Sequence, residues 1–110
     1  MAYSELLAMR FRDALGARSG IVEKRMMGGR VFMLDGNMLG AVGRDASGDR
    51  FMFRVGPDQI AEALDKGAVQ MEMGGRVMKG FIFVREAGAH DTLEDWVAMA
   101  RRFVETLPAK

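Results

Sequence analysis

The pentapeptide MGGRV occurs twice in this 110-residue chain, at residues 27–31 and again at residues 73–77, each time between short apolar runs. Two adjacent glycines can both adopt the positive φ angles that a tight two-residue turn requires. We therefore predict that each pair turns one β-strand back onto the next. The alternatives are an anion-binding nest of backbone amides and an internal duplication, but the similarity fades outside the five letters. The predicted turn residues are Gly28, Gly29, Gly74 and Gly75.

The sequence around the first glycine pair has the pattern of a four-stranded antiparallel meander, with apolar runs separated by turn residues. The runs are residues 22–27, 30–34, 38–42 and 50–55. Asp35-Gly36-Asn37 is a tight-turn sequence between the second and third runs, and Gly48 lies in a looser loop before the fourth. Side chains alternate in the fourth run, which predicts a half-buried strand.

Helical patterns stand before, between and after the strands. Ser4 can cap a first helix, and Gly56-Pro57-Asp58 begins a second helix that Gly67 ends. A second hairpin follows over residues 69–73 and 77–84. The last helix begins near Thr92, where Thr92 with Asp95, or Asp91 with Glu94, forms a capping-box pattern, and Pro108 closes it.

The resulting order is helix, four strands, helix, two strands, helix, without the regular alternation of a parallel sheet. We predict one α+β domain over residues 1–110, with two layers. An antiparallel sheet of about six strands forms one layer, and the helices pack on one face of it.

Composition excludes several classes of protein. The chain has 16 Lys and Arg against 15 Asp and Glu, so its net charge of +1 gives no large field that would attract nucleic acid or acidic lipid. It has no cysteine, which excludes disulfides and thiolate sites. No uncharged apolar run approaches the roughly 20 residues that cross a bilayer, so we expect a soluble protein without membrane contact.

The residue types that perform catalysis or hold metals are sparse. His90 is the one histidine, and no Ser, His and acid form an identifiable set. Asp45, Ser47 and Asp49 have calcium-loop spacing, but Arg50 stands where that loop needs glycine. Eleven methionines favour adaptable packing over capture of a soft metal. We expect no enzyme activity, no cofactor and no metal; a small-molecule or enzyme function in an unseen pocket is the third and least favoured class.

Five basic residues lie in or beside the two glycine turns, and neighbouring turns would gather them into one patch. They are Lys24, Arg25, Arg30, Arg76 and Lys79. The patch would suit an acidic protein partner or a phosphate backbone, and the plainer alternative is a solvated surface partly neutralised by Glu23 and Glu72. Residues 79–84, KGFIFV, are similar to an RNA-stacking strand, but the match is partial and favours core packing.

Two runs, Val31 to Leu34 and Phe81 to Val84, are apolar on both alternating faces, so both sides of the sheet need cover. Three short helices cover only one side. We therefore predict that another copy of the chain covers the second side in a homodimer, the commonest oligomer of soluble proteins.

The assembled motifs resemble the N-terminal domain of the TfoX/Sxy family, bacterial regulators of natural competence, over nearly the whole chain. The motifs are residues 23–29 (EKRMMGG), 32–38 (FMLDGNM), 54–57 (RVGP), 75–80 (GRVMKG) and the terminal Leu107-Pro108. The resemblance implies a cytoplasmic, non-enzymatic regulatory or protein-interaction domain. Full-length regulators of the family carry a further C-terminal domain, and we expect a stand-alone N-terminal domain here. Direct nucleic-acid binding through the basic patch is the alternative function.

Overall fold

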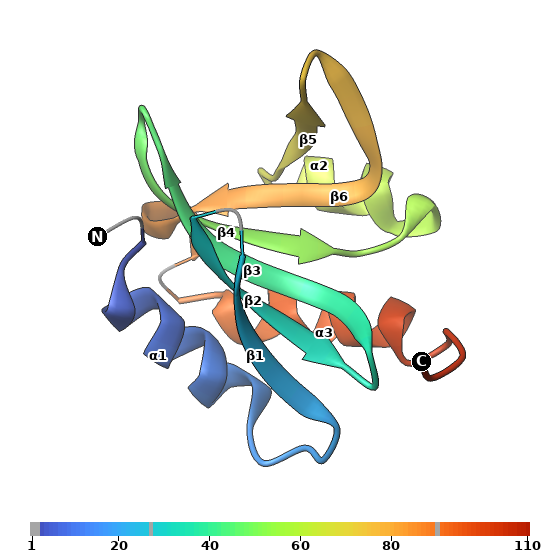
Figure 1. Ribbon diagram of the computed structural model, residues 1–110. Coiled ribbons are helices and arrows are strands. Elements are labelled where there is room, and N and C mark those ends of the chain that lie inside the picture. The colour runs from blue at the N-terminus through green and yellow to red at the C-terminus, as the bar shows by residue number, and fades with distance from the viewer. Residues whose placement is uncertain (1–2, 27, 90) are drawn as a thin grey trace.

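The computed structural model describes residues 3–26, 28–89 and 91–110, and within them it has the predicted α+β fold (Figure 1). The helices are α1 (Glu5–Leu15), α2 (Ile60–Asp65) and α3 (Leu93–Val104). The strands are β1 (Ile21–Met26), β2 (Gly29–Leu34), β3 (Asn37–Asp45), β4 (Gly48–Arg54), β5 (Val69–Met73) and β6 (Arg76–Arg85). Two 3₁₀ turns, η1 (Pro57–Gln59) and η2 (Glu86–Ala89), precede α2 and α3.

The strands form one open sheet in the order β1-β2-β3-β4-β6-β5, and every neighbouring pair is antiparallel. The first four strands follow one another as a meander. The chain then passes through α2 to the far edge, so β5 lies outside β6. The two MGGRV hairpins, β1–β2 and β5–β6, therefore form opposite edges of the sheet.

The second glycine pair forms the predicted two-residue turn. Met73 pairs with Arg76 across it, and Gly74 and Gly75 have φ angles of 61° and 81°. This is the positive-φ geometry that matches the twist of a hairpin and that glycine adopts without strain.

The first glycine pair differs from the prediction by one residue. Met26 pairs with Gly29, so Gly29 already belongs to β2; Gly28, with a φ of 76°, lies in the connection between the strands, and Met27 lies outside the described residues. Gly29 has a packing role, because a Cβ there would lie 2.5 Å from the carbonyl oxygen of Val42 on β3. Glycine at this position lets the two strands approach closely.

The two remaining hairpins of the meander are both tight. Asp35 and Gly36 form the predicted turn, with φ angles of 52° and 85°. The looser loop expected over residues 45–49 is wrong: β3 and β4 continue until Asp45 pairs with Gly48, which leaves a two-residue turn. The Asp45 carboxylate accepts a hydrogen bond from the Ser47 amide at 2.9 Å, and this Asx turn satisfies a backbone donor within the tight connection.

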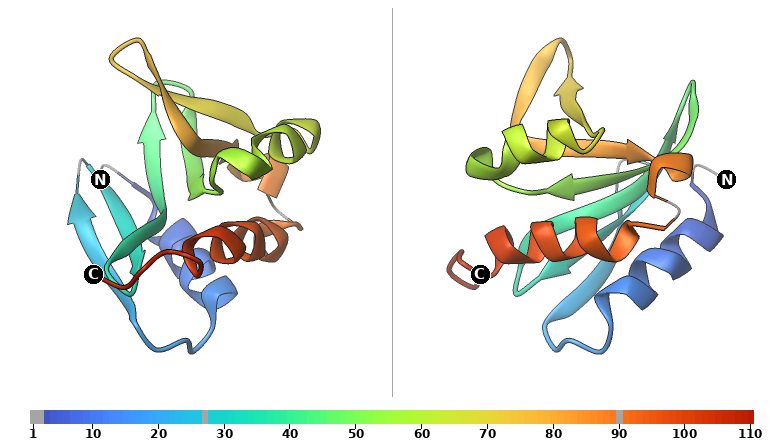
Figure 2. Two further views of the ribbon diagram at one scale, coloured as in Figure 1. Left: turned by 90° about the vertical axis from the view of Figure 1, so that its right-hand side faces the viewer. Right: turned by 180° about the vertical axis from the view of Figure 1, so that it is seen from behind.

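The main hydrophobic core lies between the sheet and the three helices, on what we call the helix face (Figure 2). Phe11 of α1 stacks on Phe32 of β2 with ring centroids 4.4 Å apart, and Phe53 of β4 lies 5.5 Å away. A Cβ on Gly40 of β3 would lie 2.7 Å from the Phe11 ring, so glycine makes room for it. Trp96 of α3 stacks against Phe53 and extends this aromatic cluster.

The helix starts follow the sequence in one case and depart from it in the other. The Ser4 hydroxyl accepts a hydrogen bond from the Leu7 amide at 3.3 Å, as predicted for α1. Thr92 is the N-cap of α3 but makes no side-chain cap, so the expected capping box from Thr92 is wrong. Its hydroxyl donates to the Gly88 carbonyl at 3.2 Å instead, because η2 brings that carbonyl within reach.

Among the described residues, none of the helices is long and apolar enough to cross a bilayer.

Candidate interaction surface

The side of the sheet that faces away from the helices, which we call the second face, carries its own apolar row. Strand register places Val31, Ala41, Met52 and Phe83 side by side across β2, β3, β4 and β6. Val31 and Ala41 are buried although they are not part of the core against the helices. Neighbouring strands and side chains of the second face itself therefore cover them.

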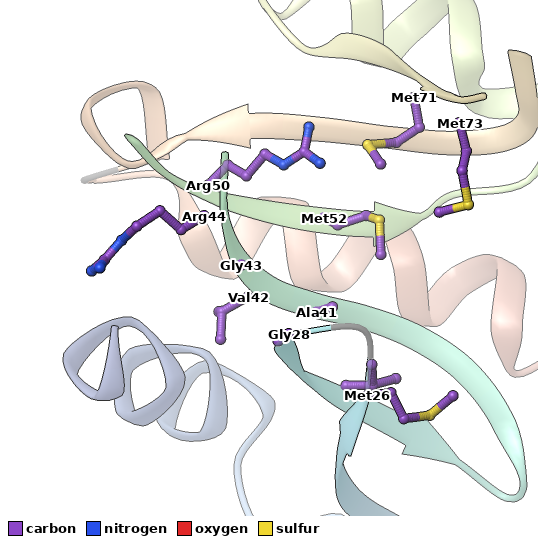
Figure 3. A pocket seen from close by; sticks show the side chains of 12 residues that line it. Met26, Gly28, Ala41, Val42, Gly43, Arg44, Arg50, Met52, Met71 and Met73 are labelled. Carbon is purple, nitrogen blue, oxygen red and sulfur yellow. The ribbon is translucent and has the colours of Figure 1, made fainter. Parts of the chain in front are cut away.

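A hollow on the second face lies between the two MGGRV hairpins, and we call it the methionine groove (Figure 3). Met26 stands on the β1–β2 side, Met71 and Met73 stand on the β5–β6 side, and Met52 of β4 lies between them. The cavity has a volume of about 120 Å³. Its full lining is Met26, Gly28, Gly29, Val31, Ala41, Val42, Gly43, Arg44, Arg50, Met52, Met71 and Met73.

Small residues on β3 open the floor of the methionine groove. Ala41 and Gly43 point toward the second face, and a Cβ on Gly43 would meet no atom within 4 Å. A large side chain at either position would fill the space that the cavity occupies.

A bend in β6 accompanies the far wall of the methionine groove, which Met71 and Met73 of β5 form. Gly80 has a φ of 84°, and its carbonyl accepts hydrogen bonds from the amides of Val55 and Gly56. The outer part of the β5–β6 hairpin leaves the plane of the sheet beyond this point (Figures 1 and 2). A register shift between Gln70 and Glu72 then turns Met71 into the groove, where it is 2% exposed.

One end of the methionine groove is cationic. Arg85 donates to both carboxylate oxygens of Asp45, at 2.7 and 2.8 Å, and this hydrogen bonding holds the Asp45 pKa well below its usual range. Arg50 lies 3.5 Å from the same carboxylate and stacks over the Phe83 ring at 4.7 Å. Arg44 pairs with Asp49 at 2.6 Å. Three guanidinium groups thus share two carboxylates.

The five predicted contact residues divide between the two edges of the sheet. Arg25 and Arg30 are cross-strand partners in the first hairpin, and Lys24 is exposed beside them. Arg76 and Lys79 are exposed on the second hairpin, and β3 and β4 lie between the two hairpins in the sheet. A single patch made by adjoining turns does not follow from this topology, although both hairpins border the methionine groove.

Arg30 differs from the other four basic residues because it takes part in the packing of α1. Val42, its partner on β3, belongs to the core, so the Arg30 side chain faces the helices. It lies 3.9 Å from Glu5 and 3.8 Å from Glu23, and it stacks over the Tyr3 ring. Its charge is largely matched within the domain.

Two further cavities lie on the helical side. One, of about 430 Å³, lies between α1 and the start of α3 and is lined mainly by carboxylates. The other, of about 320 Å³, lies beside Trp96, Thr92 and Lys66. The Thr92 hydroxyl donates to a backbone carbonyl rather than to a base, so it is not arranged as a nucleophile. No cluster of His, Cys, Asp or Glu that could hold a metal occurs in residues 3–26, 28–89 and 91–110.

Comparison with known families matches residues 13–104, from the last turn of α1 to the end of α3, to the TfoX N-terminal domain. The chain belongs to the TfoX N-terminal domain family. Neither the curated proteins nor the solved structures include a match.

The methionine groove of this TfoX N-terminal domain could not be read from the sequence as a site. In the sequence, the eleven methionines indicate adaptable packing and not a particular site. The hollow depends on Met26, Met52 and the second hairpin meeting across β3 and β4, and hence on a strand order and a bend that no local pattern encodes.

Proposed function

We propose that this chain is a non-enzymatic regulatory domain that acts by binding another protein through the second face of its sheet. The observation that carries the proposal is the methionine groove. Met26 and Met73 on its walls are 44% and 53% exposed, and Val22 and Val69 extend the apolar surface at 51% and 50%. Exposed apolar side chains gathered around a hollow on one face of a domain are typical of a contact site.

The composition of the groove also supports a protein partner. Methionine side chains are flexible and polarisable, and they adapt to the shape of an incoming surface. Membership of the TfoX N-terminal family supports a regulatory role, and we infer that the domain works in the cytoplasm in control of transcription or competence.

Site-specific photo-crosslinking in the native cells tests this proposal. A benzophenone amino acid at position 73, on the groove wall, is expected to give a discrete adduct with another polypeptide. The matched control is position 9, because Met9 is exposed to a similar extent, 47%, but lies on α1. Equal adduct yields at the two positions, or none at position 73, would contradict a contact site on the second face.

The partner can also be a second copy of the chain, as the two-sided apolar pattern of the strands predicts. Sedimentation velocity over roughly 1 to 100 µM, the range in which a weak dimer dissociates, measures this directly. Self-association that Met73→Glu abolishes would assign the second face to a homodimer. A monomer at every concentration would mean that the partner of the second face is a different protein.

Nucleic-acid binding is the second candidate function, and the exposure of four basic residues favours it. Lys24, Arg25, Arg76 and Lys79 are exposed. Binding to a phosphate backbone predicts an affinity that falls steeply with added salt, and a loss of affinity in Arg25→Ala. A fluorescence titration of single- and double-stranded oligonucleotides at low salt checks this; an unchanged signal would remove the candidate.

A further inference from the structure

The size of the methionine groove limits what can occupy it. Pockets that bind cofactors or other small molecules usually have volumes of about 300 to 1,000 Å³. A cavity near 150 Å³ holds a molecule about as large as benzene. At about 120 Å³, the groove has room for one bulky apolar side chain of a partner, such as phenylalanine or leucine.

The walls of the groove can close around such a side chain. Met26 and Met73 are about half exposed on opposite sides of the cavity, and both have rotatable thioether chains. Val31 and Ala41 form a buried floor that water does not reach freely. A side chain that enters the groove would lose its contact with water on every side. Energetically dominant interface residues usually occupy such water-free pockets.

Arg50 supplies a polar feature next to this apolar hollow. In Figure 3 its side chain extends from β4 toward Met71. Arg85 already engages both oxygens of Asp45, whereas Arg50 lies 3.5 Å from the nearer oxygen. Its guanidinium therefore keeps donors available, and a guanidinium can pair with a carboxylate through two parallel hydrogen bonds.

The charges around the groove favour an acidic partner over a second copy. Arg44, Arg50 and Arg85 carry three positive charges at the groove end, against two negative charges on Asp45 and Asp49. Lys24 adds a further positive charge beside Val31 on the second face. A second copy stacked on this face would bring the same surplus against it. A partner that carries carboxylates would neutralise it, which is the complementarity that selects one protein over another.

We propose that the methionine groove binds a segment of an acidic protein partner. The segment inserts one bulky apolar side chain between Met26, Met52 and Met73 and places a carboxylate on Arg50. This inference rests on the proposed function, because it names the partner chemistry of the same surface.

Titration with peptides, followed by NMR of ¹³C-methyl-labelled methionines, tests the proposal. One capped peptide has a phenylalanine flanked by glutamates, and the matched peptide has lysines in their place. The glutamate peptide is expected to shift the methyl signals of Met26, Met52 and Met73, and to bind about tenfold more tightly than the lysine peptide. Met99 of α3 is buried in the core on the helix face, so its methyl signal reports whether the fold is intact.

Three variants separate charge from shape. Arg50→Gln is expected to remove most of the preference for the glutamate peptide, and Arg50→Lys to restore part of it. Ala41→Val narrows the floor and is expected to weaken the glutamate peptide severalfold without changing the preference. Arg25→Gln is the matched control, because it removes an exposed arginine from β1 that does not line the groove.

Two results would overturn the inference. In the first, the lysine peptide binds as well as the glutamate peptide. In the second, crosslinking at position 73 yields only dimers of this chain. Both would leave the second face as a protein contact. Failure of crosslinking at position 73 would instead reject the proposed function itself, so the two ideas fail separately.

Discussion

The two faces of the sheet are built from different side chains, and the difference separates folding from contact. On the helix face, Phe11, Phe32, Phe51 and Phe53 are all fully buried and stack on one another. On the second face, methionines surround a hollow, and two of them, Met26 and Met73, are about half exposed. Rigid aromatic rings specify one packing arrangement, whereas flexible thioethers leave a surface that can adjust. One face of the sheet thus carries a fully buried core, and the other carries an apolar surface that is only partly buried.

The largest expected loss of stability comes from removing an aromatic ring from the core on the helix face. Phe11→Ala leaves a cavity beneath α1 and is expected to lower the free energy of unfolding by about 3 to 5 kcal/mol. Met73→Ala on the second face is expected to change it by less than about 0.5 kcal/mol, because that side chain is 53% exposed. Urea unfolding followed by circular dichroism measures both. Similar losses in the two variants would mean that the second face also stabilises the monomer.

Two glycines on β3 offer a closer comparison, because they lie three residues apart and point to opposite faces. A Cβ at Gly40 would lie 2.5 Å from the Met52 carbonyl oxygen and 2.7 Å from the Phe11 ring, whereas a Cβ at Gly43 would meet nothing within 4 Å. Gly40→Ala is expected to cost about 1 to 3 kcal/mol through overpacking. Gly43→Ala is expected to be neutral or to stabilise by up to about 1 kcal/mol, because it restricts the unfolded chain.

Thermal or urea unfolding of the two alanine variants checks this pair. Equal destabilisation would show that Gly43 also has a required conformation. The result bears on the methionine groove directly, since Gly43 lines it and an added methyl group there would reduce its volume.

Local sequence patterns predicted the tight turns and the first helix well. Asp35-Gly36 and Gly74-Gly75 turn the chain where positive φ angles are needed, and the spacing of Leu7, Phe11 and Leu15 gives α1 its buried stripe. These features depend on residues close together in the sequence. Thr92 shows the limit even there, because a neighbouring 3₁₀ turn diverts its hydroxyl.

The second face could not be predicted in the same way. Its hollow depends on a register shift at Met71, a bend at Gly80 and small residues at Ala41 and Gly43, which come together only through the strand order. An apolar alternation in the sequence indicates that a side needs cover. It does not indicate whether the cover comes from the chain's own hairpins, and here the β5–β6 hairpin supplies part of it.

The smallest expected effect concerns two carboxylates, one on each face. A hydrogen bond from Arg85 lowers the pKa of Asp45, and one from Arg12, at 2.7 Å, lowers the pKa of Glu23. Because the folded-state pKa values are depressed, both pairs stabilise the fold above the usual carboxyl pKa of about 4. That contribution is lost as pH falls through the lower folded-state values. Solvent screens both pairs, so we expect modest changes.

Urea midpoints at pH 7 and pH 3 measure this contribution. Asp45→Asn and Glu23→Gln are each expected to lower stability at pH 7 and to narrow the difference between the two pH values. Asp45→Asn also frees Arg85 and Arg50 at the groove end, so it is expected to strengthen binding of the glutamate peptide, whereas Glu23→Gln leaves that binding unchanged. A pH dependence identical to that of the unsubstituted chain would contradict the role of the substituted carboxylate.

The exposed thioethers of the methionine groove are open to oxidation. The chain has 11 methionines and no cysteine, so all of its sulfur is thioether. Among the described methionines, Met99 alone belongs to the core against the helices, while Met26 and Met73 meet solvent. Hydrogen peroxide would convert the exposed thioethers to polar sulfoxides, which methionine sulfoxide reductases reverse. The methionine groove would then lose its apolar surface while the core and the fold stayed intact. A methionine sulfoxide reductase could restore that surface.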